Sequence, residues 1–86
     1  MKFFVYLILS KKNNKYLSYV GYTMNLNKRL ALHNSSKGAK YTRGSKWILI
    51  YKKEYNTKSD AMREEYKLKN NYTLRKRIKN IYINKI

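Results

Sequence analysis

Carboxylates are the scarcest reactive groups in this sequence. There are only four of them, at Glu54, Asp60, Glu64 and Glu65, against 21 lysines and arginines. Any reaction that needs a carboxylate as general acid, general base or metal ligand must use one of these four. The chain has no cysteine and a single histidine, which excludes thiolate zinc sites and His-based metal clusters. The chemistry left open is that of one or two carboxylates with a cation, of tyrosine hydroxyls, or of one imidazole.

The net charge of +17 predicts a polyanionic partner, and the likeliest polyanion in a cell is nucleic acid. A hydrophobic fraction of 43% without any proline favours a packed fold over disorder, and 86 residues allow one domain, residues 1–86. The apolar residues 3–9 are too few to span a membrane and lack the features of a signal peptide. We therefore expect no membrane partner and a location in the cytoplasm or nucleoid, or in the nucleus of a eukaryote.

Two strands and a tight turn are predicted at the start of the chain. Residues 3–9 (FFVYLIL) form an unbroken apolar run, typical of a central strand that is covered on both faces. Residues 11–15 (KKNNK) contain Asn13-Asn14, which tolerates positive φ and so favours a hairpin. The second strand is then residues 16–23.

The remaining pattern predicts helices around a third strand. A helix follows Thr23 or Asn25 as N-cap and ends near Asn34, residues 35–46 form a basic loop, and residues 47–55 form a strand. Two helices follow, at residues 59–70 and about 74–81. The fold class is therefore α/β (α+β): a small three-stranded, mainly antiparallel sheet flanked by helices, in the order ββαβαα.

Glu65 is the carboxylate of greatest interest. On a helical projection it falls within the apolar arc of Ala61, Leu68 and Tyr72, which Met62 and Tyr66 are expected to widen. One interpretation is an i,i+4 ion pair with Lys69, worth little on an exposed face. The other is an inward carboxylate, which needs a partner such as a divalent cation.

Arg29 and His33 lie one turn apart on the first predicted helix, and His33 shares the face of Leu26 and Leu30. A single histidine on such a face is usually a core residue with both nitrogens satisfied. Arg29 at such a place is usually solvated. Both gain a chemical role only if this face meets the tyrosines of the strands and Glu65.

Basic and aromatic residues of the loop and the last helix are candidates for contacts with DNA phosphates and bases. These are Lys40, Tyr41, Arg43, Lys46, Arg75, Lys76 and Arg77.

Together these pieces resemble the GIY-YIG nuclease domain, especially its small stand-alone and structure-specific repair members. Residues 4–6 (Phe-Val-Tyr) and 19–21 (Tyr-Val-Gly) stand for the two triplets that name the family. Residues 25–30 with His33 resemble its first-helix motif, residues 37–40 its loop, and residues 61–66 the helix with the metal glutamate. The first triplet lacks its glycine, and Tyr22 stands where some members have a lysine.

The resemblance implies a metal-dependent DNA endonuclease that acts on branched or irregular DNA, in repair or recombination, with little sequence readout. It implies one Mg²⁺ or Mn²⁺ at Glu65, Arg29 on the scissile phosphate, Tyr19 in the site and Tyr6 as activator of the water. A one-metal scheme agrees with the shortage of carboxylates. His33 is an alternative base or an orienter of a tyrosine hydroxyl.

Strand alternation separates the three tyrosines of the second strand. Tyr19 shares a face with Gly21, whereas Tyr16 and Tyr22 lie on the other face and are expected to pack. We expect Tyr19 to lie opposite Tyr6, and Gly21 to leave a gap through which a backbone or phosphate comes close. The competing hypothesis is a non-catalytic DNA- or RNA-binding module of the same fold, and a protein partner or a homodimer is left open.

Overall fold

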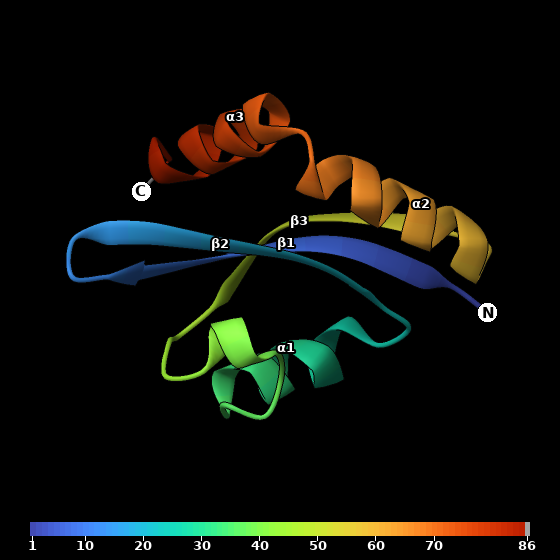
Figure 1. The fold of residues 1–86 in the computed structure, drawn as a ribbon, viewed down its shortest axis with the longest axis horizontal. Coiled ribbons are helices and arrows are strands. Elements are labelled where there is room, and N and C mark those ends of the chain that lie inside the picture. Colours follow the sequence, from blue (N-terminus) through green and yellow to red (C-terminus); the bar gives the residue numbers. More distant parts are fainter. Residues whose placement is uncertain (86) are drawn as a thin grey trace.

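A computed structural model of the chain, which describes residues 1–85, contains a three-stranded sheet with helices on both faces (Figure 1). β1 (Phe3–Lys12) lies in the middle, between β2 (Lys15–Thr23) and β3 (Ile48–Tyr55). Both pairings are antiparallel. The expected α+β fold and the order ββαβαα are confirmed, and the sheet is antiparallel throughout.

The turn between β1 and β2 sets the register of the hairpin. Asn13 and Asn14 have φ of 52° and 64°, the left-handed values that two-residue hairpin turns require and that asparagine tolerates. Lys12 therefore pairs with Lys15, and counting back along the strands pairs Tyr6 with Gly21. The sequence of the turn thus decides which residue of β2 faces the tyrosine of the first triplet.

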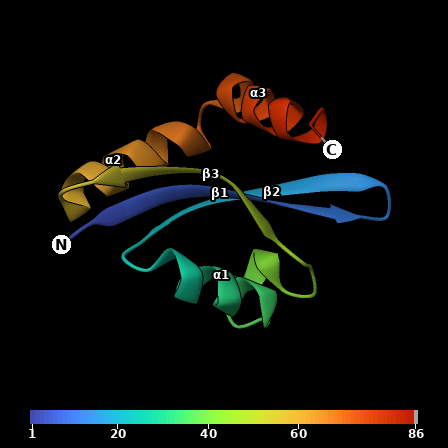
Figure 2. The same cartoon turned by 180° about the vertical axis from the view of Figure 1, so that it is seen from behind.

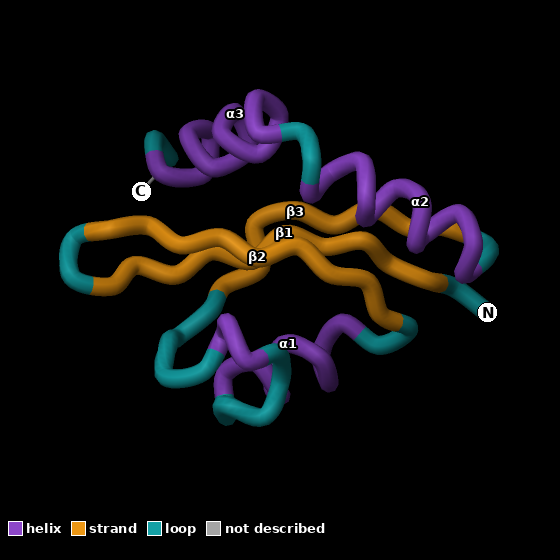
Figure 3. Tube along the Cα trace, viewed as in Figure 1, coloured by secondary structure: helices purple, strands orange, loops and turns teal. Residues whose placement is uncertain are grey.

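One face of the sheet is covered by α1 (Leu26–Asn34) and by the connection from α1 to β3, which contains a short 3-10 turn, η1 (Lys40–Thr42) (Figures 1 and 3). Asn25 is the N-cap of α1, because its side-chain oxygen accepts the Lys28 N–H at 3.1 Å. The hydroxyl of Thr23, the other candidate cap, accepts the N–H of Asn25 instead, at 3.2 Å.

The other face is covered by α2 (Lys58–Lys69) and α3 (Tyr72–Ile83), as the view from behind also shows (Figure 2). Thr57 caps α2 by accepting the Asp60 N–H at 3.1 Å, and Asn71 caps α3 by accepting the Leu74 N–H at 3.0 Å. Over residues 1–85, no helix has the length and hydropathy that crossing a bilayer requires.

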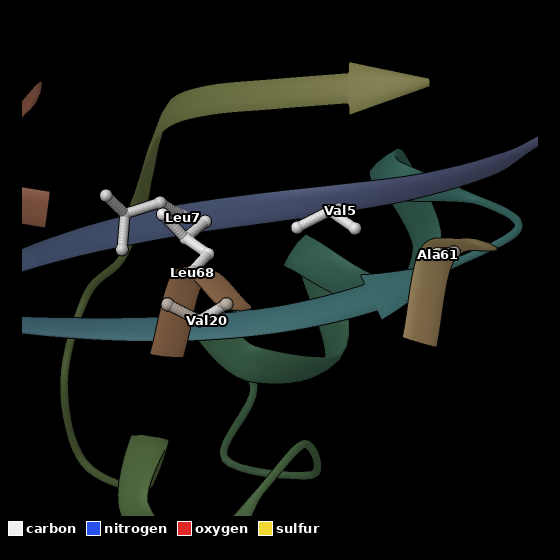
Figure 4. Close-up of a cluster of buried hydrophobic side chains, with 5 residues drawn as sticks. All are labelled: Val5, Leu7, Val20, Ala61 and Leu68. Atoms are coloured by element: carbon white, nitrogen blue, oxygen red, sulfur yellow. The ribbon is translucent and has the colours of Figure 1, made fainter. Parts of the chain in front are cut away.

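Strand alternation divides the core into two clusters. Val5, Leu7 and Val20 pack against Ala61 and Leu68 of α2 (Figure 4). Tyr6 and Ile8 point to the opposite face, where they pack with Trp47. The strand covered on both faces is thus confirmed.

The expected widening of the α2 apolar arc is wrong. Met62 and Tyr66 are 48% and 69% exposed. Tyr72, the third predicted member of the arc, begins α3 and is 63% exposed. Only the narrow stripe of Ala61 and Leu68 is buried on α2. Leu74 and Ile78 of α3 pack against the same cluster, so α2 does not have to cover that face of the sheet alone.

Candidate active site

Tyr6 occupies the middle of β1, directly across from Gly21 of β2. A Cβ at position 21 would lie 2.6 Å from Cζ of Tyr6 and still closer to its hydroxyl. The absence of a side chain at Gly21 therefore makes room for the Tyr6 ring itself. This corrects two expectations: the gap is filled by Tyr6 instead of by a backbone or phosphate, and Tyr19 lies opposite Ile8.

A chain of three hydrogen bonds runs from Tyr6 into the interior. The hydroxyl of Tyr6 lies 2.8 Å from Nε2 of His33, Nδ1 of His33 lies 2.8 Å from the hydroxyl of Thr42, and that hydroxyl donates to the carbonyl of Ala39 at 2.8 Å. Since a threonine hydroxyl has one proton, Thr42 must accept from Nδ1–H of His33. A neutral His33 then has a bare Nε2, and Tyr6 donates its proton to it.

Several backbone contacts hold this chain of groups in place. A Cβ at Gly38 would lie 3.0 Å from Cα of His33, so only glycine allows the loop to pack over the imidazole. The indole N–H of Trp47 donates to the carbonyl of Thr42 at 2.9 Å. Asn34 binds the backbone of Trp47 twice, through Oδ1 at 2.5 Å and Nδ2 at 3.1 Å. The end of α1 is thereby fixed to the start of β3.

Thr42 is the functional candidate that sequence reasoning missed. It is fully buried, like His33, yet it lies in a basic loop without any hydrophobic periodicity. The spacing of nine residues between His33 and Thr42 corresponds to no helical or strand period, so no local sequence signal identified this pair.

The electrostatics of the site favour the neutral forms of Tyr6 and His33. Burial raises the pKa of Tyr6 above its ordinary value, against the opposing effect of the Arg29 guanidinium. Burial also lowers the pKa of His33, and Arg29 lowers it further. A neutral imidazole that accepts from a neutral phenol is therefore the state near pH 7.

Arg29 projects from α1 beside Tyr6, and the two residues line one small cavity. It is half-buried rather than solvated. None of the ion pairs formed within residues 1–85 includes Arg29. A partly desolvated guanidinium without a carboxylate partner is well suited to bind a phosphate.

Tyr19 and Glu65 complete the group of predicted site residues. The Tyr19 ring meets the His33 ring edge-on, with 5.1 Å between the centroids. The Glu65 side chain is only 17% exposed and forms the i,i+4 pair with Lys69, at 3.4 Å between Oε1 and Nζ. Its charge contributes to raising the pKa of Tyr6. Both interpretations of Glu65 thus hold in part: it pairs with Lys69, and its side chain is largely buried.

The donor set at Glu65 is small but suits one hard cation. Among residues 1–85 no group of three or more His, Cys, Asp or Glu side chains could enclose a metal ion. Magnesium is commonly held by one or two carboxylates with water and substrate phosphate as its other ligands. Glu65 therefore fits a single Mg²⁺ or Mn²⁺ that is completed by substrate, and does not fit a pair of ions.

The predicted DNA-contact residues lie on both faces of the sheet. Lys40 and Tyr41 belong to η1, with Arg43 and Lys46 just beyond it, and all four are at least half-exposed. Arg75, Lys76 and Arg77 belong to α3. One groove at the outer edge of β2 brings Tyr41 and Arg75 together with Tyr19. Arg77 does not line this groove.

A known protein family and several known proteins match most of this chain. A family model described as the GIY-YIG catalytic domain matches residues 2–80. A UPF0213 protein of Staphylococcus haemolyticus is 44% identical over 69 residues, 79% of this chain and 80% of that protein. A UPF0213 protein of Staphylococcus epidermidis is 41% identical over 81 residues, 93% of this chain and 94% of that protein.

Among solved structures, the solution NMR structure of a UPF0213 protein from Bacillus halodurans is 37% identical, with a TM-score of 0.47, and the match covers 96% of this chain and 85% of that one. The family model spans nearly the whole chain, and the staphylococcal relatives match over most of their own length. The chain therefore belongs to the GIY-YIG catalytic domain family, a family of nucleases.

Proposed function

We propose that this protein is a divalent-metal-dependent DNA endonuclease that hydrolyses phosphodiester bonds, with a preference for branched or irregular DNA. The observation that carries the proposal is the hydrogen bond of 2.8 Å from the Tyr6 hydroxyl to Nε2 of His33, beside the guanidinium of Arg29, which forms no ion pair within residues 1–85. Hydrolysis needs a proton acceptor for the attacking water and a cation for the phosphate. Tyr6 with His33 supplies the proton acceptor, and Arg29 supplies the cation beside it.

The proton is relayed from Tyr6 to His33. For the Tyr6 hydroxyl to be half-deprotonated near pH 7.5, its pKa would have to fall by about 2.5 units from the reference value. Burial instead raises the pKa of Tyr6. His33 is fully buried, whereas Tyr6, although only 2% exposed, lines a small cavity together with Arg29. As the water oxygen bonds to phosphorus and the bond between phosphorus and the leaving oxygen breaks, Tyr6 takes a proton of the water and passes its own to Nε2. The leaving alkoxide takes its proton from solvent. The negative phosphodiester then stabilises the imidazolium.

The other residues position the substrate and stabilise charge. Arg29 binds the non-bridging oxygens of the scissile phosphate, and Tyr19 keeps the imidazole of His33 in place through its ring edge. A Mg²⁺ or Mn²⁺ held by Glu65 would supply Lewis-acid stabilisation of the leaving oxygen. Glu65 would then exchange its present partner, Lys69, for the cation.

The experiment is a cleavage assay of Glu65→Gln against a neighbouring control. Parent protein, Glu65→Gln and Glu64→Gln are incubated with flap, fork, Holliday and plain duplex DNA plus Mg²⁺ or Mn²⁺. Glu64 is the matched control, since it lies on the same helix, is 31% exposed and pairs with Lys67 at 3.2 Å. We expect Glu65→Gln to lose at least about a hundredfold in rate, because a metal ligand contributes several kcal/mol of charge stabilisation.

Binding is measured on the same substrates to separate chemistry from affinity. We expect Glu65→Gln to bind DNA as the parent does, and Glu64→Gln to cleave as the parent does. Equal cleavage by all three proteins would indicate a contaminating nuclease. No cleavage of any substrate by the parent, with binding retained, would favour the non-catalytic DNA- or RNA-binding module.

A further inference from the structure

A groove runs along the outer edge of β2. None of its lining residues belongs to the hydrogen-bonded chain of Tyr6, His33 and Thr42. Ser18 and Tyr19 of β2, Tyr41 of η1, Lys69 of α2 and Arg75 of α3 line a space of about 240 Å³. A second, smaller depression continues from it, sharing Ser18 and Arg75, and is lined further by Tyr72, Lys76 and Lys79. Since β2 is an edge strand, this path lies between the η1 side and the α3 side of the sheet (Figure 1).

One wall of the groove is an aromatic platform that is already fixed. Tyr41 stacks on Tyr19, with 6.1 Å between centroids and 23° between planes, and packs against Trp47 at 6.2 Å. The backbone next to it is held by the bond from the Trp47 indole to Thr42. Even so, Tyr41 remains 55% exposed. The protein thus holds a rigid aromatic ring with much of its surface open to solvent.

The other wall is an arginine held in a fixed orientation. Nε of Arg75 donates to the carbonyl of Leu68 at 3.1 Å, and its guanidinium lies 5.8 Å from the ring centroid of Tyr72. Within residues 1–85, the four carboxylates form ion pairs with lysines and with Arg63, and none of these pairs includes Arg75. The two terminal nitrogens of Arg75 therefore remain available for the planar, bidentate contact that guanidinium makes with phosphate.

We propose that this groove binds a single-stranded DNA segment next to the scissile phosphate, with one unpaired base on Tyr41 and a backbone phosphate on Arg75. The inference rests on the proposed function for its substrate, DNA. Inside a duplex both faces of every base are covered by its neighbours, so an exposed ring in a groove stacks only on an unpaired or extruded base. Stacking platforms interleaved with cations are the recurring features of single-strand binding.

The groove also connects to the reaction centre at two points. Tyr19 contacts the His33 ring, and Lys69 pairs with Glu65. A strand in the groove would therefore enter directly beside the groups that act on the phosphate. This makes the junction between duplex and single strand the preferred place of cleavage, and gives a physical basis to the preference for irregular DNA.

The test measures affinity and stacking without requiring cleavage. Glu65→Gln protein is titrated, in metal-free buffer with EDTA, against a blunt duplex and against duplexes with a 5′ or 3′ single-stranded tail that carries 2-aminopurine at the junction. We expect at least one tailed duplex to bind about tenfold more tightly than the blunt one, the order of effect that one stacked base produces. The 2-aminopurine fluorescence should be quenched on binding.

Two variants in the same background identify the groove as the site. Tyr41→Leu, which keeps an apolar side chain, should abolish both the quenching and the tail preference. Arg75→Lys keeps the charge but loses the fork and the bond to Leu68, so the tail preference should fall severalfold. Arg77→Ala is the matched control: it removes a charge from the same helix outside the groove, and should weaken blunt and tailed duplexes by the same factor.

Equal affinity for blunt and both tailed duplexes would overturn the proposal. So would a tail preference that survives Tyr41→Leu, or one that Arg77→Ala reduces as much as Arg75→Lys does. The folded state of each variant is checked by circular dichroism. If the tail preference is found although the parent protein cleaves no DNA, the groove stands and only the proposed catalytic activity fails.

Discussion

At the scale of single residues, the site is defined by the direction of its hydrogen bonds. The carbonyl of Ala39 accepts from Thr42, which obliges Thr42 to accept from His33 and His33 to accept from Tyr6. The loop thus determines the tautomer of the imidazole before any substrate arrives. Protonation of His33 would reverse the last of these bonds, since Nε2 would become a donor and the Tyr6 hydroxyl would have to accept from it.

The stability of the protein should therefore depend on pH through His33. Its pKa is lowered in the folded state, so the unfolded chain takes up a proton near pH 6.5 while the folded chain does not. The unfolded state then binds more protons, and the free energy of unfolding falls with decreasing pH. We expect it to be constant from pH 8 to 7 and to decline below about 6.5, as measured by urea unfolding.

This pH dependence can be assigned to His33 because it is the only histidine in the chain. His33→Gln should flatten the dependence between pH 7 and 5, where carboxylates have not yet been protonated to a large extent. Thr42→Ser keeps the hydroxyl and should preserve the decline. A decline of the same size in His33→Gln would mean that another group carries the effect.

At the scale of elements, local patterns predicted the helices and strands well. The cap at Asn25, the Asn13-Asn14 turn and the apolar run of β1 are local signals, and each is observed in its expected place. These predictions succeeded because capping and turn geometry depend on residues within a few positions of one another. The metal-binding role that family resemblance gives to Glu65 stays a prediction.

The contacts that could not be predicted are those between elements. The pairing of Tyr6 with Gly21 instead of Tyr19 depends on the exact length of the hairpin loop, and a shift of two residues was enough to misplace it. The link from His33 to Thr42 depends on how the loop folds back over α1. The groove that joins Tyr41 to Arg75 depends on the order of strands in the sheet.

The cross-strand pair of β1 and β2 gives a prediction at this scale. Gly21→Ala places a Cβ against the Tyr6 ring, and overpacking of this kind typically costs about 1–3 kcal/mol. Tyr6→Leu shortens the opposing side chain and relieves the contact. In a double-mutant cycle by urea unfolding, we expect Gly21→Ala to destabilise the parent and to be much less harmful in the Tyr6→Leu background. Equal costs in both backgrounds would contradict the role assigned to Gly21.

At the scale of the whole molecule, the dominant fact is the uncompensated charge of +17. All four carboxylates already have lysine or arginine partners, and these pairs are mostly exposed, where ion pairs contribute little. The Debye length is about 30 Å at 0.01 M salt and about 10 Å at 0.1 M, while the molecule measures 37 × 28 × 21 Å. Repulsion therefore acts across the whole fold at low salt and is largely screened above 0.1 M.

Salt should consequently act in opposite directions on stability and on binding. Raising NaCl from 20 to 300 mM screens the repulsion, so we expect the free energy of unfolding to rise. Binding of duplex DNA by Glu65→Gln should weaken, because each neutralised phosphate contributes about −0.9 to the slope of log affinity against log salt. Six contacts, from Lys40, Arg43, Lys46, Arg75, Lys76 and Arg77, predict a slope of about −5, or roughly a thousandfold between 50 and 200 mM.

Two controls separate screening from other effects of salt. KCl should reproduce the stabilisation by NaCl at equal ionic strength, whereas stabilisation seen only with sulfate would point to a specific anion site or to exclusion from the surface. Each single alanine substitution among the six contacts should reduce the steepness of the binding slope by about one unit. A binding slope near zero would contradict the six phosphate contacts. A free energy of unfolding that falls with salt would show that the ion pairs of the four carboxylates outweigh the net repulsion.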